Sequence, residues 1–352
     1  MLVLVIVSLT SWECYVRSKG FETSYDDNPA LWADKRADVY EPADQSTVFI
    51  GSSRIKFDLD IPTFESATGD HAIQLACVGS NPIPILENLA ADPDFKGKLV
   101  VDVTEVLFFS TSPHNVETPL KNLKYYKDRT PAQRVSFQLN HLLESQLAFI
   151  DKDRLSMNAE LGNLHLHDRP GVFGEPIFPV EFGRVRFNRQ EYMTDHFVTD
   201  TAARNQVKGI WAFFAKMSKD PPVSGPKLDS IFNVVKIAVD KIKARGGQVL
   251  FVRTPSSGEF LFGEKMGYPR EKYWDKLVSQ LQCPSLYFLD YPAIAHFECP
   301  ENSHLSQPDA ILFTNEFIRI LTQEKGWKFR NLPAVVKYYS TLNLLSSWFL
   351  TH

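Results

Sequence analysis

Two short segments far apart in the chain carry residue types that hydrolytic enzymes use. Residues 48–54 (VFIGSSR) place two serines and an arginine directly after an apolar run. Such a run is typical of a buried parallel strand, and ligands of open α/β sheets bind beyond the carboxyl ends of these strands. Residues 301–305 (ENSHL) supply a histidine with a carboxylate three residues before it. Together the two segments predict a site built from a serine, a histidine and an acid.

Each segment also has an ordinary structural interpretation. Gly-Ser-Ser-Arg after a strand is a common strand-to-helix turn, because serine caps helices and glycine permits tight geometry. A single histidine in Ser-His-Leu is usually structural. The occurrence of both segments in this order, with further matching blocks between them, favours the catalytic interpretation.

This order of blocks resembles the SGNH (GDSL-type) hydrolase superfamily, whose nucleophile block reads Gly-Asp-Ser and whose last block reads Asp-x-x-His. The resemblance implies that Ser53 is the nucleophile, while Ser52 stands where the family has aspartate and is the second choice. It also implies that His304 is the general base and that Glu301 replaces the family's aspartate. A glutamate can orient an imidazole as an aspartate does.

The resemblance further implies an oxyanion hole. The family's second block is a glycine after the next strand, which corresponds to Gly79, and its backbone N–H would bind the oxyanion. The third block normally offers an asparagine at the end of a strand, whereas here residues 99–103 run into Thr104 without one. The Thr104 hydroxyl is the candidate replacement. Losing one oxyanion donor typically costs about 10²–10³ in turnover.

Two arginines are candidates for substrate binding. Arg54 follows the proposed nucleophile, and Arg253 directly follows the predicted strand 248–252 at the same sheet edge. A guanidinium group there would suit a carboxylate or a sugar acid. The alternative for Arg253 is an ion pair that fixes its loop.

These groups predict a serine esterase or an O-acyltransferase that works through an acyl-enzyme. The two activities use the same residues, so the blocks do not separate them. By analogy with envelope-bound members of the superfamily, the expected substrate is a small-molecule or polysaccharide ester of the cell envelope. The absent asparagine and the Ser52 replacement leave a second function open, that of a non-catalytic SGNH-like scaffold or carbohydrate-binding protein.

Composition limits the other function classes. The 352 residues are 44% hydrophobic and 12% aromatic with a net charge of -4, which indicates a globular protein and gives no electrostatic basis for nucleic-acid binding. The four cysteines show no Cys-x-x-Cys spacing. His165, His167 and Asp168 have no further ligands at a recognisable spacing, so we expect no metal and no cofactor.

The N-terminus bears on location. Residues 1–9 are almost wholly apolar, but the run of roughly a dozen residues is shorter than the about 20 that span a bilayer, and no basic residue precedes it. We expect a membrane anchor or a truncated signal segment at 1–19, with membrane contact through the N-terminus and a location in the cell envelope, anchored or exported. A buried strand is the alternative. The basic residues on the distal side argue against export.

The remaining pattern alternates strands and helices, which predicts a flavodoxin-like, doubly wound parallel α/β sheet of the SGNH type. We expect a linker at 20–44, one α/β domain at 45–330 with an irregular insertion at about 151–200, and an apolar extension at 331–352. The first expected strand ends at Ile50. The other four expected strands span 73–78, 99–103, 248–252 and 286–290. The expected helices span 30–39, 82–91, 131–150, 201–217, 228–245, 270–281 and 308–322.

Overall fold

The computed structural model describes residues 1–162, 176–218 and 221–331, and the chain divides into two compact units. One unit comprises Met1–Asp34 and Lys121–Lys219, and the other comprises Lys35–Leu120 and Asp220–His352. Every residue proposed from the sequence for the site lies in the second unit. The expected extension at 331–352 lies outside the described residues except for Asn331.

The second unit is built on a five-stranded sheet in the order β2-β1-β3-β6-β7 in which every pairing is parallel. The prediction of an α/β protein with a parallel central sheet is confirmed. If only the five strands of this sheet are numbered along the chain, their order across the sheet is 2-1-3-4-5, which is compatible with a flavodoxin-like sheet. The strands are β1 Ser46–Ile50, β2 His71–Gln74, β3 Lys98–Asp102, β6 Gln248–Arg253 and β7 Ser285–Tyr287.

The central strands β1 and β3 carry apolar runs because both of their faces are covered. All five residues of β1 and of β3 are buried, and Val48 pairs with Ile73 on one side and with Leu99 on the other. The sheet grows from β1 toward β2 and then in the opposite direction through β3. The topological switch point therefore lies between β1 and β3, where ligands of such sheets bind.

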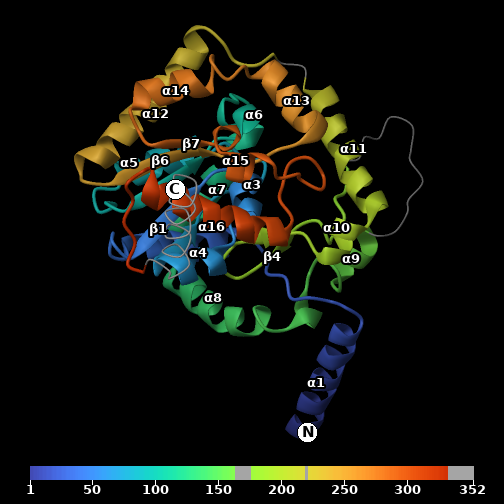
Figure 1. Ribbon diagram of the computed structural model, residues 1–352. Helices are drawn as coiled ribbons and strands as arrows, with labels where there is room; N and C mark the ends of the chain where they lie inside the picture. The colour runs from blue at the N-terminus through green and yellow to red at the C-terminus, as the bar shows by residue number, and fades with distance from the viewer. Residues whose placement is uncertain (163–175, 219–220, 332–352) are drawn as a thin grey trace, which may run out of the picture. The chain divides into compact units, whose positions relative to one another are not determined.

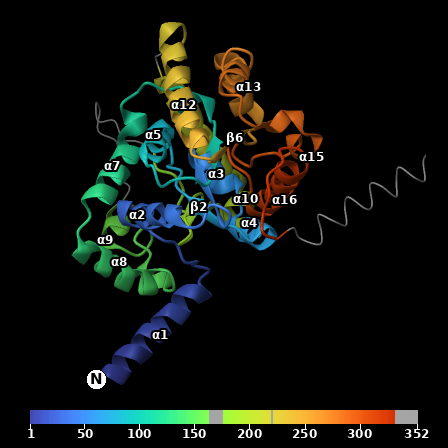
Figure 2. The same cartoon turned by 90° about the vertical axis from the view of Figure 1, so that its left-hand side faces the viewer.

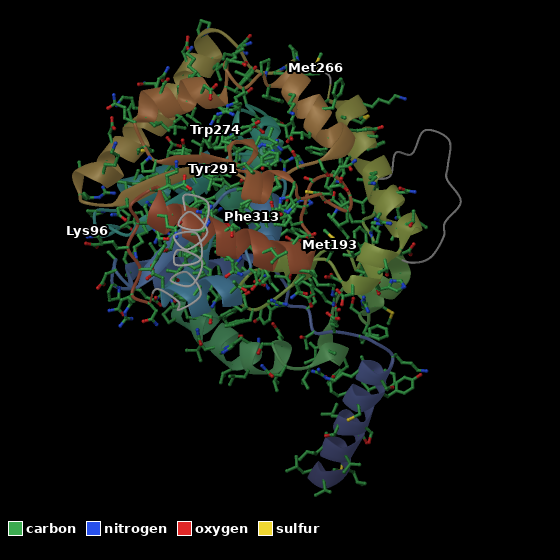
Figure 3. All side chains as sticks on the ribbon, in the orientation of Figure 1. Lys96, Met193, Met266, Trp274, Tyr291 and Phe313 are labelled. Carbon is green, nitrogen blue, oxygen red and sulfur yellow. The ribbon has the colours of Figure 1, made fainter. Side chains whose placement is uncertain are left out.

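Helices cover the sheet in two layers, as Figure 1 shows. On one side α5 packs against α12, and α12 packs against α14. On the other side α16 packs against α3 and α4. Figure 3 labels Trp274 of α14 and Phe313 of α16, and both side chains are buried. The bounds are α3 Ser53–Asp58, α4 Ile61–Thr68, α5 Ile83–Ala91, α6 Glu105–Phe108, α12 Pro226–Ala244, α13 Gly258–Gly267, α14 Trp274–Leu281, α15 Pro292–Ala295 and α16 Gln307–Gln323, with short 3₁₀ helices η1 Asp38–Tyr40 and η3 Phe288–Asp290.

The first unit is mainly helical. Its elements are α1 Leu2–Ser18, α8 Pro131–Glu144, η2 Ala148–Ile150, α9 Met157–Gly162, the hairpin of β4 Arg184–Val185 and β5 Glu191–Tyr192, α10 Asp195–Thr199 and α11 Thr201–Met217. Helices α2 Pro29–Ala37 and α7 His114–Asp128 continue from one unit into the other. The expected irregular insertion at 151–200 falls within this unit. His165, His167 and Asp168 lie outside the described residues, among which no His, Cys, Asp and Glu cluster could hold a metal ion.

Several element boundaries differ from the sequence prediction. The helix expected over 131–150 ends at Glu144, and β2 and β7 end before the predicted 78 and 290. Helices α3, α4, α7 and α13 were not among the predicted helices. Short helices such as α3 carry too few residues for a clear 3.6-residue periodicity. All four cysteines are free.

The N-terminal segment forms helix α1, which extends away from the rest of its unit (Figure 2). Met1 to Val7 are each at least 48% exposed, so the expected alternative of a buried strand is wrong. Within the described ranges of the chain, no helix combines the length and the apolar character needed to cross a membrane.

Candidate active site

The proposed nucleophile lies in a tight turn between β1 and α3. A side chain at Gly51 would place its Cβ 2.6 Å from Asp102 Cβ at the end of β3 and 2.9 Å from Ile55 Cγ2 of α3, so only glycine fits between them. Ser52 caps α3 by accepting a hydrogen bond from the Arg54 N–H, which is the usual role of serine at this position. Ser53 then becomes the first residue of the helix, and its side chain is half-buried at the carboxyl edge of the sheet.

The three predicted catalytic side chains meet in the structure. Ser53 Oγ lies 2.9 Å from His304 Nε2, and His304 Nδ1 lies 2.9 Å from Glu301 Oε1. Both distances are within hydrogen-bonding range. With Nδ1 donating to the carboxylate, Nε2 is left to accept the serine proton, which is the orientation that a general base requires.

A compact turn explains how an acid three residues before the histidine reaches its ring. Glu301 Oε1 accepts hydrogen bonds from the backbone N–H of Ser303 at 3.2 Å and of His304 at 2.6 Å. Asn302 has a φ of 81°, a left-handed conformation that asparagine tolerates better than most residues. Glu301 is 0% and His304 1% exposed, so water does not compete for their hydrogen bond.

Ser52 has different partners. Its Oγ lies 2.7 Å from Thr104 Oγ1 and 3.4 Å from Asp102 Oδ2, and its side chain is buried. The Thr104 hydroxyl, which the sequence offered as an oxyanion donor, also donates to Asp102 at 3.2 Å. These contacts assign Ser52 and Thr104 to a hydrogen-bonded cluster beneath the turn, and they leave Ser53 as the serine that contacts the imidazole.

The Gly79 loop runs beside the nucleophile turn because the Cys77 N–H donates to the Gly51 carbonyl at 3.1 Å. Gly79 is exposed with a φ of 61°, and the Asn115 amide donates to its carbonyl at 3.0 Å. Among the described residues, neither the Gly79 N–H nor the Ser53 N–H has a hydrogen-bond acceptor. Two backbone donors at this sheet edge are therefore available to a ligand.

The two arginines proposed for substrate binding are both buried in ion pairs. Arg54 Nη2 lies 2.5 Å from Glu264 Oε1, and Arg253 Nη2 pairs with the other oxygen of Glu264. Arg253 Nε also donates to Glu105 Oε1 at 3.3 Å. Burial disfavours the charged carboxylate, but Arg253 and Arg54 outweigh it and hold the pKa of Glu264 below its usual range. For Arg253, these contacts agree with the alternative interpretation of an ion pair that fixes a loop.

Arg54 also joins the nucleophile helix to the histidine loop. Its Nε donates to Ser303 Oγ at 3.3 Å, and its guanidinium carbon lies 5.0 Å from the centre of the Phe260 ring. One side chain thus links α3, α13 and the turn that carries His304. This arrangement gives Arg54 a positioning role close to the serine.

Asp58, at the end of α3, supports the histidine loop from below. Its Oδ1 accepts a hydrogen bond from the Leu305 N–H at 2.9 Å, and the Phe57 ring lies 4.4 Å from the His304 ring. Burial raises the pKa of Asp58 to about 7, although His304, the Leu305 N–H and the Thr254 hydroxyl oppose this rise. Asp58 therefore titrates near neutral pH in the folded protein.

The raised pKa of Asp58 predicts a pH-dependent loss of stability. Between its ordinary value of 3.8 and about 7, the unfolded chain releases the proton while the folded chain keeps it, so the free energy of unfolding falls as pH rises. We expect Asp58→Asn to remove this dependence, which amounts to on the order of 2–4 kcal/mol. Urea unfolding of both proteins at intervals from pH 4 to about 8 measures it. Parallel pH profiles of the two proteins would contradict the assignment.

The sequence did not identify three residues that support the site, namely Asp58, Asp102 and Glu264. Asp102 had a detectable signal, because a carboxylate at the end of a wholly buried strand must find partners. Asp58 and Glu264 lie on helices that were not predicted, so the sequence offered no reason to place them at the site. No protein-family model matches the chain, and a comparison with curated proteins finds no significant match.

Proposed function

We propose that this protein is a serine esterase or O-acyltransferase of the SGNH type. The observation that carries the proposal is the continuous hydrogen-bonded series from Ser53 through His304 to Glu301, with both distances at 2.9 Å. The serine is half-buried while its two partners are wholly buried, an arrangement suited to a nucleophile that meets substrate and a base that water does not reach.

In the proposed reaction His304 removes the proton from Ser53 as its Oγ attacks an ester carbonyl. The tetrahedral intermediate collapses, His304 gives the proton to the departing alcohol, and the acyl group remains on Ser53. Water or a second hydroxyl group then attacks the acyl-enzyme while His304 removes its proton. His304 returns this proton to Ser53 Oγ as the acyl group leaves. The Glu301 carboxylate stabilises the imidazolium in both halves.

The oxyanion would be bound by the backbone N–H groups of Ser53 and Gly79. Both donors lack acceptors among the described residues, and the Cys77–Gly51 hydrogen bond holds their loops side by side. The Thr104 hydroxyl is already shared between Ser52 and Asp102, so we assign it a positioning role. Asn115 supports the Gly79 peptide rather than the oxyanion itself.

Labelling with a fluorophosphonate tests the proposal, because this probe reacts with an activated serine. We expect the full-length wild-type protein to be labelled and Ser53→Ala to remain unlabelled. Equal labelling of the two proteins would remove the catalytic proposal. The alternative of a non-catalytic scaffold or carbohydrate-binding protein would then take its place.

We also propose that the first unit contacts a membrane surface or another apolar phase in the cell envelope. Along α8, the side chains of Val135, Leu139, Leu142 and Leu143 are each at least 58% exposed and recur on one face. The Glu13 carboxylate of α1 accepts hydrogen bonds from the backbone N–H groups of Ala148 and Phe149 in η2. These bonds hold the apolar helix α1 against η2, the element that follows α8.

Flotation with anionic phospholipid vesicles measures this contact. We expect the wild-type protein to float with the vesicles and Leu139→Glu/Leu143→Glu to remain largely in solution, because charged side chains oppose burial in lipid. As the control, Gln133→Glu adds a charge to the polar first turn of α8 and leaves flotation unchanged. Equal flotation of wild type and the double variant would exclude α8 from the contact.

A further inference from the structure

The loop after β2 contains one peptide group whose direction decides whether a proposed oxyanion donor is available. This peptide joins Val78 to Gly79, and it consists of the Val78 carbonyl and the Gly79 N–H. The strands β1 and β2 are parallel neighbours, and the Cys77 N–H donates to the Gly51 carbonyl at 3.1 Å, so the loop lies beside the nucleophile turn. The direction of the Gly79 N–H therefore matters for an oxyanion formed at Ser53.

The Ser80 side chain fixes the direction of this peptide. Its Oγ donates to the Val78 carbonyl at 2.9 Å, and Ser80 is only 2% exposed. Because the peptide bond is planar and trans, its carbonyl and its N–H point in opposite directions. The carbonyl faces a buried hydroxyl group, so the Gly79 N–H faces the other side of the loop, which is open because Val78 and Gly79 are both exposed.

The backbone alone would hold this direction weakly. Turning the peptide over changes ψ of Val78 and φ of Gly79, and glycine adopts positive and negative φ with similar ease. Gly79 has a φ of 61°, and a Cβ built on it would meet no described atom within 4 Å, so no described group crowds this residue. In the turned state the Val78 carbonyl would replace the N–H at the oxyanion position and repel its negative charge.

The following part of the loop has its own anchor. The Asn115 amide donates to the Gly79 carbonyl at 3.0 Å, and the Asn115 carbonyl accepts from the Asn81 N–H at 2.8 Å. These bonds hold the peptides after Gly79 and leave the Val78–Gly79 peptide unbonded. Within the described ranges, the Ser80 hydroxyl is the one group that forms a hydrogen bond with that peptide.

We propose that Ser80 is a positioning residue that holds the Gly79 N–H in the direction required to bind the oxyanion. This role rests on the proposed function, because it requires an oxyanion to form at Ser53. Both halves of the proposed reaction form that oxyanion, whereas the bound ester does not carry it. Loss of the Ser80 hydroxyl should therefore lower kcat and leave KM nearly unchanged.

Steady-state hydrolysis of p-nitrophenyl butyrate by the full-length proteins tests this role. We expect Ser80→Ala to lower kcat by about 10–100-fold, which is less than complete removal of a donor, because the variant still samples the productive direction. KM should change by less than about twofold. Ser80→Cys has a similar size but a weaker donor, so its kcat should lie between those of the wild type and Ser80→Ala.

Ser279→Ala is the matched control, because Ser279 Oγ also donates to a backbone carbonyl at 2.9 Å, that of Lys276, and lies on the exposed face of α14. Its kcat should equal that of the wild type. A folded Ser80→Ala protein with the wild-type kcat, or with a loss confined to KM, would overturn the role of Ser80 and leave the proposed function intact. If Ser80→Ala does not fold, a wild-type kcat for Ser80→Cys has the same meaning.

Failure of the proposed function gives a different result. Wild-type protein that neither hydrolyses the ester nor reacts with fluorophosphonate would refute the proposed function, and the role of Ser80 would fall with it.

Discussion

Replacing Ser53 with alanine is expected to lower the turnover of p-nitrophenyl acetate and butyrate by about 10⁴–10⁶, because it removes the nucleophile of a group that acts as a unit. His304→Ala should cause a loss of similar size, since Ser53 Oγ has its hydrogen bond to His304 Nε2 at 2.9 Å. Initial rates of hydrolysis by the full-length proteins measure both effects.

Ser52→Ala is the matched control for Ser53→Ala. The two residues are adjacent and have the same side chain, but Ser52 Oγ contacts Thr104 and Asp102 rather than the imidazole. Its loss removes a helix cap, which costs about 0.5–2 kcal/mol of stability, and should change turnover by less than about tenfold. The reverse result, with Ser52 essential and Ser53 dispensable, would contradict the assignment of the nucleophile.

The second large effect is expected on stability. Glu264→Ala should lower the free energy of unfolding by about 3–5 kcal/mol, because it leaves the buried guanidinium groups of Arg54 and Arg253 without their shared carboxylate. The loss should exceed that of an ordinary surface change, since both arginines are at most 1% exposed. Urea unfolding followed by tryptophan fluorescence measures the difference.

Glu259→Ala provides the comparison within the same helix. Glu259 is exposed near the start of α13, and changes at such positions usually stay within about 0.5 kcal/mol. A loss below about 1 kcal/mol for Glu264→Ala would mean that water or rearranged side chains replace the ion pairs.

The sequence could predict the sheet because most of its strands can be recognised from their residue pattern. β1, β3 and β6 each contain an uninterrupted apolar run, as expected where both faces of a strand are covered, and their order along the chain indicated a parallel α/β sheet. Ser53 could be proposed because it follows a predicted strand, whereas Glu301 and His304 were proposed from an order of blocks that resembles the SGNH superfamily.

Only the tertiary structure distinguished the two serines. Ser52 and Ser53 have the same chemistry and follow the same strand, so the resemblance alone made one the first choice and the other the reserve. The helix that starts at Ser53 directs one hydroxyl toward Thr104 and the other toward His304, which is 251 residues away along the chain. A contact of that sequence separation depends on how the strands are ordered in the sheet.

The role of the arginines was also decided by tertiary structure. From sequence, Arg54 and Arg253 were candidates for a substrate anion, because both follow strands at the edge where ligands bind. Their partner Glu264 lies on α13, whose sequence shows little amphipathic periodicity, so neither the helix nor the direction of that carboxylate could be inferred. Local patterns thus determined where the strands lie and the resemblance suggested the reactive residues, whereas the pairing of buried charges required the folded chain, because it joins residues that no local pattern relates.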